Sequence, residues 1–278
     1  MLVEAAAGLW AHSLALLSDA AHMLADSAAL ALALVAQRVA SRPRTRLRTY
    51  GFRRAETLAA LANGIALGGA ALWVVVEALR RWQHPAPIAG WAMLSVALAG
   101  LAVNALVGWL LLRARSANAN LRAAMAHVLA DAMGSLAALI AAVLVVLLGW
   151  QRADAIASIL ISMLILWAAF QLVGQTVGIL MEGVPAGVAL SDLNGTIRST
   201  RGVADLHDLH AWTISDGFDV VTVHVVLDGS AHGTDVAREV GDRIRTIHRV
   251  AHVTVQPEAP PLSSALHPAG SLVRKKSP

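Results

Sequence analysis

The stretch Ala-His-Met-Leu-Ala-Asp, residues 21–26, recurs with one substitution as Ala-His-Val-Leu-Ala-Asp, residues 126–131. Each copy lies in a long apolar run and carries a histidine four residues before an aspartate, His22 before Asp26 and His127 before Asp131. In a helix this spacing puts both side chains on one face. Ionisable side chains within a membrane are costly and mark functional sites. Two matching pairs therefore predict a shared partner for all four groups, and a divalent metal ion would serve.

The composition is that of a membrane protein. Of the 278 residues, 57% are hydrophobic and only 14% are charged, against about 25% charged in a typical soluble domain. The chain contains no cysteine, which excludes disulfides and thiolate metal sites. Any transition-metal site must therefore use histidine, aspartate or glutamate. No basic leader or small-residue cleavage site precedes the first apolar run, so we expect no signal peptide.

The apolar segments predict an α-helical polytopic membrane domain over residues 1–181. Residues 2–10 are apolar but shorter than the roughly 20 residues that cross a bilayer. We interpret them as a stub of a first helix that is truncated here. Complete spans are expected at about 13–39, 55–82, 88–112, 121–148 and 153–180.

Arginines are distributed unevenly between the two sets of loops. Ten fall in alternate connections, seven of them between residues 38 and 54, and three fall in the others. The positive-inside rule places the arginine-rich side in the cytoplasm. Because membrane topology explains where the arginines lie, we expect no nucleic-acid binding. Four tryptophans then fall at the outer interface, where indole rings prefer to lie: Trp10, Trp82, Trp91 and Trp150.

This topology also sets the depth of the two His/Asp pairs. The two spans that carry them run in opposite directions, and a rise of about 1.5 Å per residue brings both pairs near mid-membrane. Four candidate ligands therefore meet at one level of the bilayer. Asp19 shares the face of His22 but lies nearer the outer end of the span. There it is either solvated or an entrance carboxylate.

The hydropathy changes after residue 181. Residues 182–256 predict a small α+β domain, which the topology places in the cytoplasm, and residues 257–278 predict a disordered tail rich in proline, serine and lysine. Within the domain we expect helices at 189–200 and 233–249 and strands at 203–214, 220–227 and 252–256.

The four residues define the chemistry. Imidazole nitrogen and carboxylate oxygen suit zinc, and a complete four-coordinate set leaves no position for a catalytic water. Protons compete with a metal for the same groups. A mid-membrane site open alternately to each side would then exchange metal for protons, as in an antiporter. A membrane metalloenzyme is disfavoured, since His-Glu-x-x-His and multiple histidine boxes are absent. A metal-binding or sensing membrane protein that does not transport remains an alternative.

Four stretches carry a family resemblance, namely residues 13–26, 50–56, 127–131 and 207–212. Together they resemble the cation diffusion facilitators, exporters of zinc and related divalent metals. The resemblance implies six membrane helices, a ferredoxin-like cytoplasmic domain, a homodimer in the inner membrane, and exchange of metal for protons. By position it makes His22, Asp26, His127 and Asp131 the transport site, with zinc as the main ion and often cadmium. Ligand type alone does not select among zinc, cadmium, cobalt and iron.

Two regions depart from the family pattern. Some members bind a second metal in the loop before the third helix, but residues 48–52 contain neither carboxylate nor imidazole, so we expect no site there. In the cytoplasmic domain, His207 and His224 align with metal ligands of some members and His210 lies nearby. Gln256 stands where another ligand histidine often occurs. These three histidines are therefore either a cytoplasmic metal site or simply solvated, since a metal needs a full ligand set.

Overall fold

The computed structural model describes residues 2–85, 87–113 and 119–259. It divides into two compact units, Met1–Val177 and Gly178–Pro278. Each unit is described by itself.

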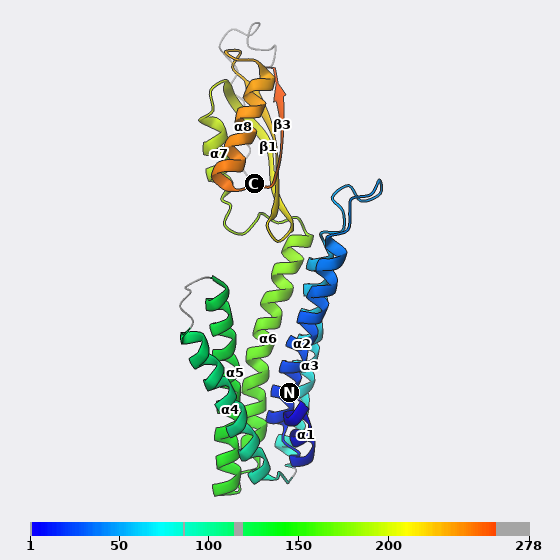
Figure 1. Ribbon diagram of the computed structural model, residues 1–278, viewed down its shortest axis with the longest axis vertical. Coiled ribbons are helices and arrows are strands. Elements are labelled where there is room, and N and C mark those ends of the chain that lie inside the picture. Colours follow the sequence, from blue (N-terminus) through cyan, green and yellow to red (C-terminus); the bar gives the residue numbers. More distant parts are fainter. Residues whose placement is uncertain (1, 86, 114–118, 260–278) are drawn as a thin grey trace, which may run out of the picture. The chain divides into compact units, whose positions relative to one another are not determined.

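The first unit is a bundle of helices (Figure 1). Five of them are long and apolar enough to cross a membrane, which confirms the five complete spans expected. The remaining helix, α1, has 10 residues and is too short to cross alone. The helices are α1 Leu2–Ala11, α2 Leu14–Ala40, α3 Ala55–Gln83, α4 Gly90–Arg113, α5 Ala119–Leu148 and α6 Arg152–Leu180.

Small side chains fill the centre of this bundle. Lipid offers no hydrophobic driving force for helix association, so membrane helices pack through small residues that let their backbones approach closely. The core follows this rule, because most of its buried members are alanines. Those alanines are Ala15, Ala71, Ala97, Ala138, Ala141, Ala142, Ala153, Ala157 and Ala169.

Hydrogen bonds join the connections at one end of the bundle. The amide of Ala89 donates to the carbonyl of Ala11 over 3.1 Å, and the amide of Ile88 donates to Gln151 Oε1, also over 3.1 Å. The Arg81 guanidinium donates to the carbonyl of His12. The α1–α2, α3–α4 and α5–α6 connections therefore meet at this end, which the arginine distribution makes the outer one.

The start of α2 is attached to α6 by a buried carboxylate. Asp154 Oδ1 accepts from Ser13 Oγ over 2.6 Å and from the Ala15 amide over 3.1 Å, and its Oδ2 accepts from the Leu14 amide over 2.8 Å. The first amides of a helix have no partner within the helix. Asp154 is 1% exposed and accepts hydrogen bonds from two of these amides. It therefore fixes the start of α2, the helix that carries His22, against α6.

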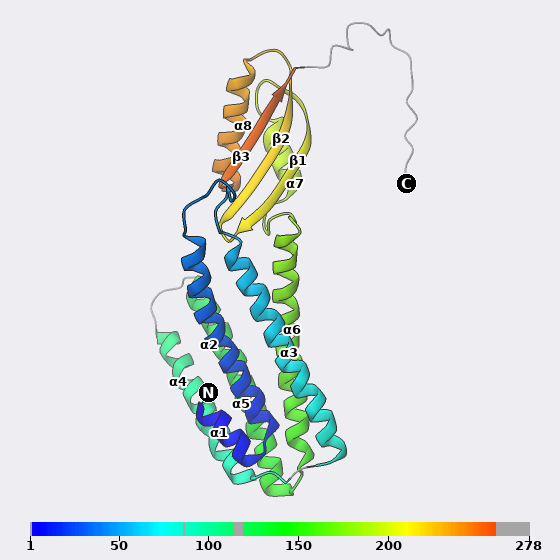
Figure 2. The same cartoon turned by 90° about the vertical axis from the view of Figure 1, so that its right-hand side faces the viewer.

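The second unit is an α+β domain, as expected. Its three-stranded sheet has the order β1-β2-β3, with β1 and β2 antiparallel and β2 and β3 parallel. Both helices cover one face of the sheet (Figure 2), and side chains from both contribute to one core with those of the strands. The elements are α7 Leu190–Arg198, β1 Val203–Ser215, β2 Phe218–Leu227, α8 Gly233–His248 and β3 His252–Glu258.

One prediction for this domain is wrong. Strand β3 continues through Pro257 and Glu258, two residues that the composition places in the predicted disordered tail. The strand extends because Pro257 and Glu258 keep the parallel register with Val225 and Val226 of β2. The rest of the predicted tail, from residue 260, lies outside the described residues.

Candidate functional site

The two His/Asp pairs interlock. His22 Nε2 lies 3.6 Å from Asp26 on its own helix and 3.5 Å from Asp131 on α5. His127 Nε2 lies 3.6 Å from Asp131 on its own helix and 3.5 Å from Asp26 on α2. Imidazoles and carboxylates therefore alternate around a closed ring of four contacts. We call His22, Asp26, His127 and Asp131 the four-residue ring.

These distances fit a tetrahedral metal ion. With metal–ligand bonds of roughly 2.0–2.2 Å, adjacent ligand atoms of a tetrahedron lie about 3.3–3.6 Å apart. The four nitrogen–oxygen contacts of the ring are all 3.5–3.6 Å. Both histidines contact the same oxygen of Asp26, Oδ2, but they contact different oxygens of Asp131. One atom from each of His22, Asp26 and Asp131 lies within 4.8 Å of the others, whereas His127 is outside that group and the centroids of the two imidazoles are 6.3 Å apart. His127 would therefore have to move closer to complete a tetrahedral set.

The four-residue ring lies at matched depths in two helices. His22 and Asp26 come eight and twelve residues after the first residue of α2, and His127 and Asp131 come eight and twelve residues after the first residue of α5. At 1.5 Å per residue these offsets are about 12 and 18 Å. Since the two helices run in opposite directions, the pairs meet within the span.

Two polar atoms of the ring retain unused bonding capacity. His22 Nδ1 is buried and has no hydrogen-bond partner among the residues that the structure describes. Asp131 Oδ1 is also buried without a hydrogen bond, and its contact with His22 Nε2 is a long ion pair of 3.5 Å. A buried polar atom that lacks a hydrogen bond costs free energy, so such atoms call for an ion, a water or a function. Here both belong to groups that could ligate a metal.

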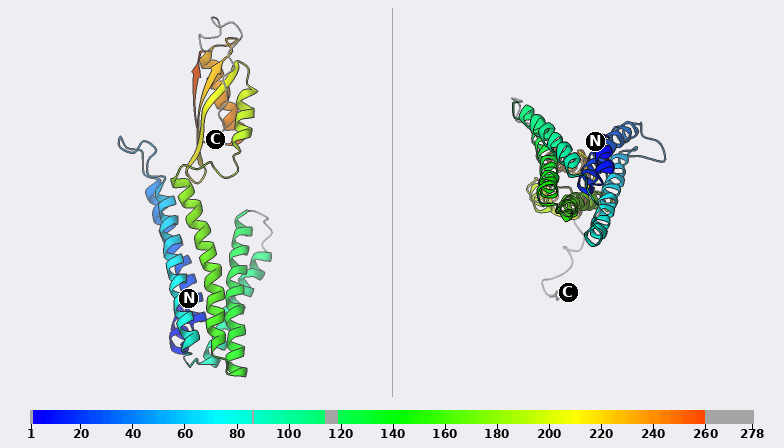
Figure 3. Two further views of the ribbon diagram at one scale, coloured as in Figure 1. Left: turned by 180° about the vertical axis from the view of Figure 1, so that it is seen from behind. Right: turned by 90° about the horizontal axis from the view of Figure 1, so that it is seen from below.

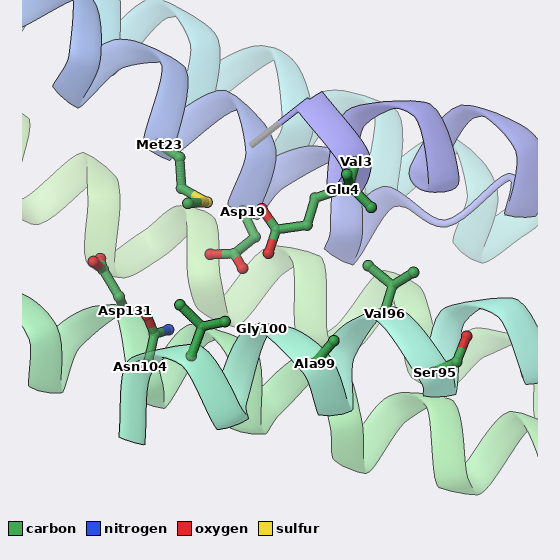
Figure 4. Close-up of a pocket in the computed structure, with 11 residues that line it drawn as sticks. Val3, Glu4, Asp19, Met23, Ser95, Val96, Ala99, Gly100, Asn104 and Asp131 are labelled. Atoms are coloured by element: carbon green, nitrogen blue, oxygen red, sulfur yellow. The ribbon is translucent and has the colours of Figure 1, made fainter. Parts of the chain in front are cut away.

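A pocket of about 340 Å³ adjoins the ring (Figure 4). It is bounded by α1, α2 and α4 and reaches Asp131 on α5. The carboxylates of Glu4 and Asp19 face it, and Asp19 is 6% exposed. Asn104 Nδ2 donates to Ser135 Oγ over 3.2 Å, and Ser135 Oγ donates to Asp19 Oδ2 over 3.5 Å. The second of these hydrogen bonds is long. Asp19 is therefore a pocket residue one turn from His22, and solvation at an open helix end does not describe it.

Two glycines leave room for these carboxylates. A Cβ atom at Gly100 would lie 3.0 Å from Glu4 Oε1 and 3.4 Å from Ser135 Oγ, and one at Gly134 would lie 3.3 Å from Asp19 Oδ1. The contacts with Glu4 and Asp19 are tighter than ordinary van der Waals contact. A side chain at either position would press on a pocket carboxylate.

A second cluster lies on the open face of the cytoplasmic sheet. His207 and His224 are register partners on β1 and β2, with ring centroids 5.1 Å apart. Glu258 on β3 joins them, because its oxygens lie 2.9 Å from His207 Nε2 and 2.8 Å from His224 Nδ1. Gln256 Nε2 donates to Glu258 Oε1 over 3.1 Å, so this residue orients the carboxylate instead of replacing a ligand.

A β-bulge separates His210 from that cluster. The register shifts between His207 and His210, and Asp208 takes a left-handed φ of 53° within the shift. Its carboxylate accepts from His210 over 2.8 Å and lies 3.7 Å from His224. His210 is therefore paired with Asp208, while His207, His224 and Glu258 form the group whose atoms lie within 4.8 Å of one another.

Hydrogen bonds to the histidines hold both carboxylates ionised. The pKa of Glu258 is lowered from its ordinary value of 4.5 by the hydrogen bond to His207 and then by the one to His224. The pKa of Asp208 is lowered mainly by its hydrogen bond to His210. An ionised carboxylate beside two imidazoles is a donor set that suits zinc.

The fold and the ring define a polytopic membrane protein with a candidate cation site inside its helix bundle. Residues 1–181 match the family described as "Cation efflux transmembrane domain", and residues 185–260 match "Cation efflux protein, cytoplasmic domain". The chain therefore belongs to the cation efflux family, whose members are transporters and not enzymes. It is a multi-pass inner-membrane protein with a cytoplasmic C-terminal domain.

Curated relatives are similar over almost their full length. The chain is 37% identical over 267 residues to the "Cadmium, cobalt and zinc/H(+)-K(+) antiporter" of Bacillus velezensis, covering 93% of this chain and 84% of that one. It is 38% identical over 263 residues to the "Zinc transporter ZitB" of Escherichia coli, covering 94% and 84%. It is 35% identical over 266 residues to the "Metal cation efflux system protein CzcD" of Cupriavidus metallidurans, covering 95% and 84%.

One solved structure matches the C-terminal part. It is described as the "Metal-bound C-terminal domain of the CzcD transporter" from C. metallidurans. The sequences are 33% identical, the match covers 26% of this chain and 99% of that one, and the TM-score is 0.25.

Proposed function

We propose that this protein exports zinc from the cytoplasm in exchange for protons, and that the four-residue ring is its transport site. The observation that carries the proposal is the alternation of imidazole and carboxylate at 3.5–3.6 Å around His22, Asp26, His127 and Asp131. The names of the relatives, which include zinc, cadmium and cobalt, support a late divalent ion as substrate.

The ring couples metal to protons through its own ligands. A histidine must be neutral to bind zinc, and a carboxylate binds best when ionised, so loading an ion expels the protons these groups carry. When the ion leaves, the same groups take up protons, which balances the charge that would otherwise stay buried in the membrane. One set of four side chains thus alternates between a metal-bound and a protonated form.

We further propose that the pocket beside the ring is the route between the site and the outer side. Its walls come from residues 95–104 of α4, most of which lie in the first half of that helix, and from α1 and the beginning of α2. Asp19 and Glu4 give the route a negative wall that attracts cations. This assigns Asp19 the role of an outer access carboxylate.

The cytoplasmic domain supports two narrower proposals. His207, His224 and Glu258 would hold a zinc ion on the open face of the sheet, with His210 outside the ligand set. The cytoplasmic-domain match favours assembly as a homodimer. The purified chain should therefore elute as a dimer in detergent, and the cluster should bind zinc without taking part in transport.

Zinc flux into vesicles under an imposed pH gradient tests the main proposal. The purified chain is reconstituted, an acidic or alkaline interior is set, and zinc movement is followed with a trapped dye. We expect zinc to move in the direction opposite to the flow of protons. This zinc movement should stop when an ionophore collapses the pH gradient. Zinc binding without gradient-dependent flux would instead indicate a binding or sensing protein.

A further inference from the structure

The loop between α2 and α3 carries a charge that the transport site does not use. We call residues 38–54, which comprise the last three residues of α2 and the connection to α3, the arginine loop. It contains seven arginines and no aspartate or glutamate. It also contains no histidine or cysteine, so it offers no ligand for a transition metal. The positive charge repels cations and attracts anions.

The arginine loop has a defined shape. Thr45 and Arg48 exchange backbone hydrogen bonds of 3.2 and 3.1 Å, which closes a tight turn over Arg46 and Leu47. The guanidinium of Arg48 lies 4.3 Å from the centre of the Phe52 ring. Gly51, with a φ of 76°, returns the chain towards α3. Figures 1 and 3 show the loop leaving the bundle outward from the ends of α2 and α3.

Its surface combines positive charge with one apolar side chain. Every residue from 41 to 50 is exposed. Leu47 stands at the tip of the turn with 96% of its surface exposed, between Arg46 and Arg48. A leucine between two arginines at the tip of a turn suits an interface where phosphates lie beside hydrocarbon.

The helix lengths place this loop at the membrane surface. Helices α2 and α3 have 27 and 29 residues, which corresponds to about 40 and 44 Å. A bilayer is about 40–45 Å thick including its headgroups. The loop therefore begins and ends in the headgroup layer, within the range of roughly 8–10 Å over which charges attract in salt.

We propose that the arginine loop binds anionic phospholipids of the cytoplasmic leaflet, with guanidinium groups on the phosphates and Leu47 inserted among the acyl chains. Basic clusters directly cytoplasmic to a membrane helix bind such lipids, and each basic residue strengthens attachment roughly five-fold. The proposal does not depend on the transport site.

An acidic protein surface is the competing partner. Residues 182–258 contain eleven acidic and six arginine side chains, so the cytoplasmic domain could attract the same charge. Lipid is favoured because the loop leaves two spans directly and because the bilayer offers the exposed Leu47 an apolar environment beside the phosphates.

The absence of cysteine from the chain makes a site-specific test simple. A nitroxide is attached to Leu47→Cys in the full chain, and the protein is placed in vesicles of phosphatidylcholine alone or with about one third phosphatidylglycerol. We expect the label to become less mobile and less accessible to a water-soluble relaxing agent only with the anionic lipid. High salt of about 1 M should reverse this partly, because it screens the phosphate contacts.

Two comparisons make the result specific. Replacing three loop arginines, Arg42, Arg44 and Arg46, with glutamine should lower the retention of phosphatidylglycerol by the purified protein on the order of ten- to a hundred-fold. A nitroxide at Ser230→Cys, exposed in the cytoplasmic domain, should not respond to lipid composition. Equal immobilisation of the Leu47 label in both vesicles would overturn the proposal and indicate docking on the acidic domain. A label that stays mobile in both would also overturn it.

Discussion

His127 Nε2 lies 3.5 Å from Asp26 Oδ2, although the two residues belong to different helices. The contact matches that between His22 and Asp131, also 3.5 Å, and both are as short as the contacts within each helix. The site therefore exists only while α2 and α5 lie together at this level. A small shift of one helix along the other would break two of the four contacts, which is how such a site could release an ion.

Removing one carboxylate of the ring should abolish transport. Asp131→Ala leaves three candidate ligands, and losing a direct ligand should weaken zinc binding by more than the roughly 10- to 100-fold that a supporting residue costs. Zinc flux into vesicles and zinc affinity by calorimetry are the measurements. Asp242→Ala, on the exposed surface of α8, is the matched control. An Asp131→Ala protein that still transports zinc would exclude this residue from the site.

The fold and dimer should survive that change, because only a ligand is removed. Helical content and elution volume in detergent should equal those of the unchanged chain. If the Asp131→Ala protein is misfolded, its loss of transport does not test whether Asp131 belongs to the site. In that case Asp131→Asn, which keeps the shape of the side chain, takes its place.

The pocket should be sensitive to one added methyl group. Gly100→Ala would place a Cβ atom 3.0 Å from Glu4 Oε1, whereas Gly108→Ala, on the same helix, would make an ordinary contact of 3.6 Å with Val128. We expect Gly100→Ala to slow zinc flux several-fold while zinc affinity measured at equilibrium stays the same. Equal flux in the two variants would show that the pocket is not the outer route.

The Asp154 carboxylate should stabilise the membrane domain. Asp154→Ala would strand the buried Ser13 hydroxyl and the amides of Leu14 and Ala15. Buried donors without partners cost about 1–3 kcal/mol each, so thermal unfolding in detergent should occur at a clearly lower temperature. Asp154→Asn should cost less, since its amide oxygen still accepts. No difference between Asp154→Ala and the unchanged chain would contradict this role.

The cytoplasmic cluster should make stability fall in acid. The pKa of Glu258 lies below 4.5 in the folded domain, so its contribution is complete above 4.5 and is lost as the pH falls through the folded value. The domain has a core of its own and can be expressed as residues 182–278. Denaturant unfolding at several pH values below 5.5 should show a weaker acid dependence for Glu258→Gln. The same slope in both proteins would mean that Glu258 is not held by the histidines.

Local sequence patterns are enough to predict much of this structure. The lengths of the apolar segments predict five spans, and the spacing of four between His22 and Asp26 predicts a shared face, because both depend only on helical geometry. The arginines also indicate that α2 and α5 run in opposite directions, which puts the two His/Asp pairs at one level. That α2 and α5 are neighbours, so that Asp26 meets His127, depends on the packing of the bundle.

Other features depend on contacts that no local pattern contains. Ser13 and Asp154 are 141 residues apart, and nothing near either residue signals the pairing. Glu258 was missed because Pro257 reads as the start of a tail, although the alternation from Gln256 places Glu258 on the same face of the strand. The bulge at Asp208 removes His210 from the cluster, and a bulge of this kind follows from strand pairing.

The exchange of zinc for protons at the four-residue ring is tested most directly by measuring both ions together. Zinc is added outside vesicles that contain the chain and a trapped pH dye, with no pH gradient imposed at the start. The account predicts that zinc entry is accompanied by proton exit, and that neither occurs with Asp131→Ala. Zinc entry without proton movement, or equal proton movement with Asp131→Ala, would contradict it.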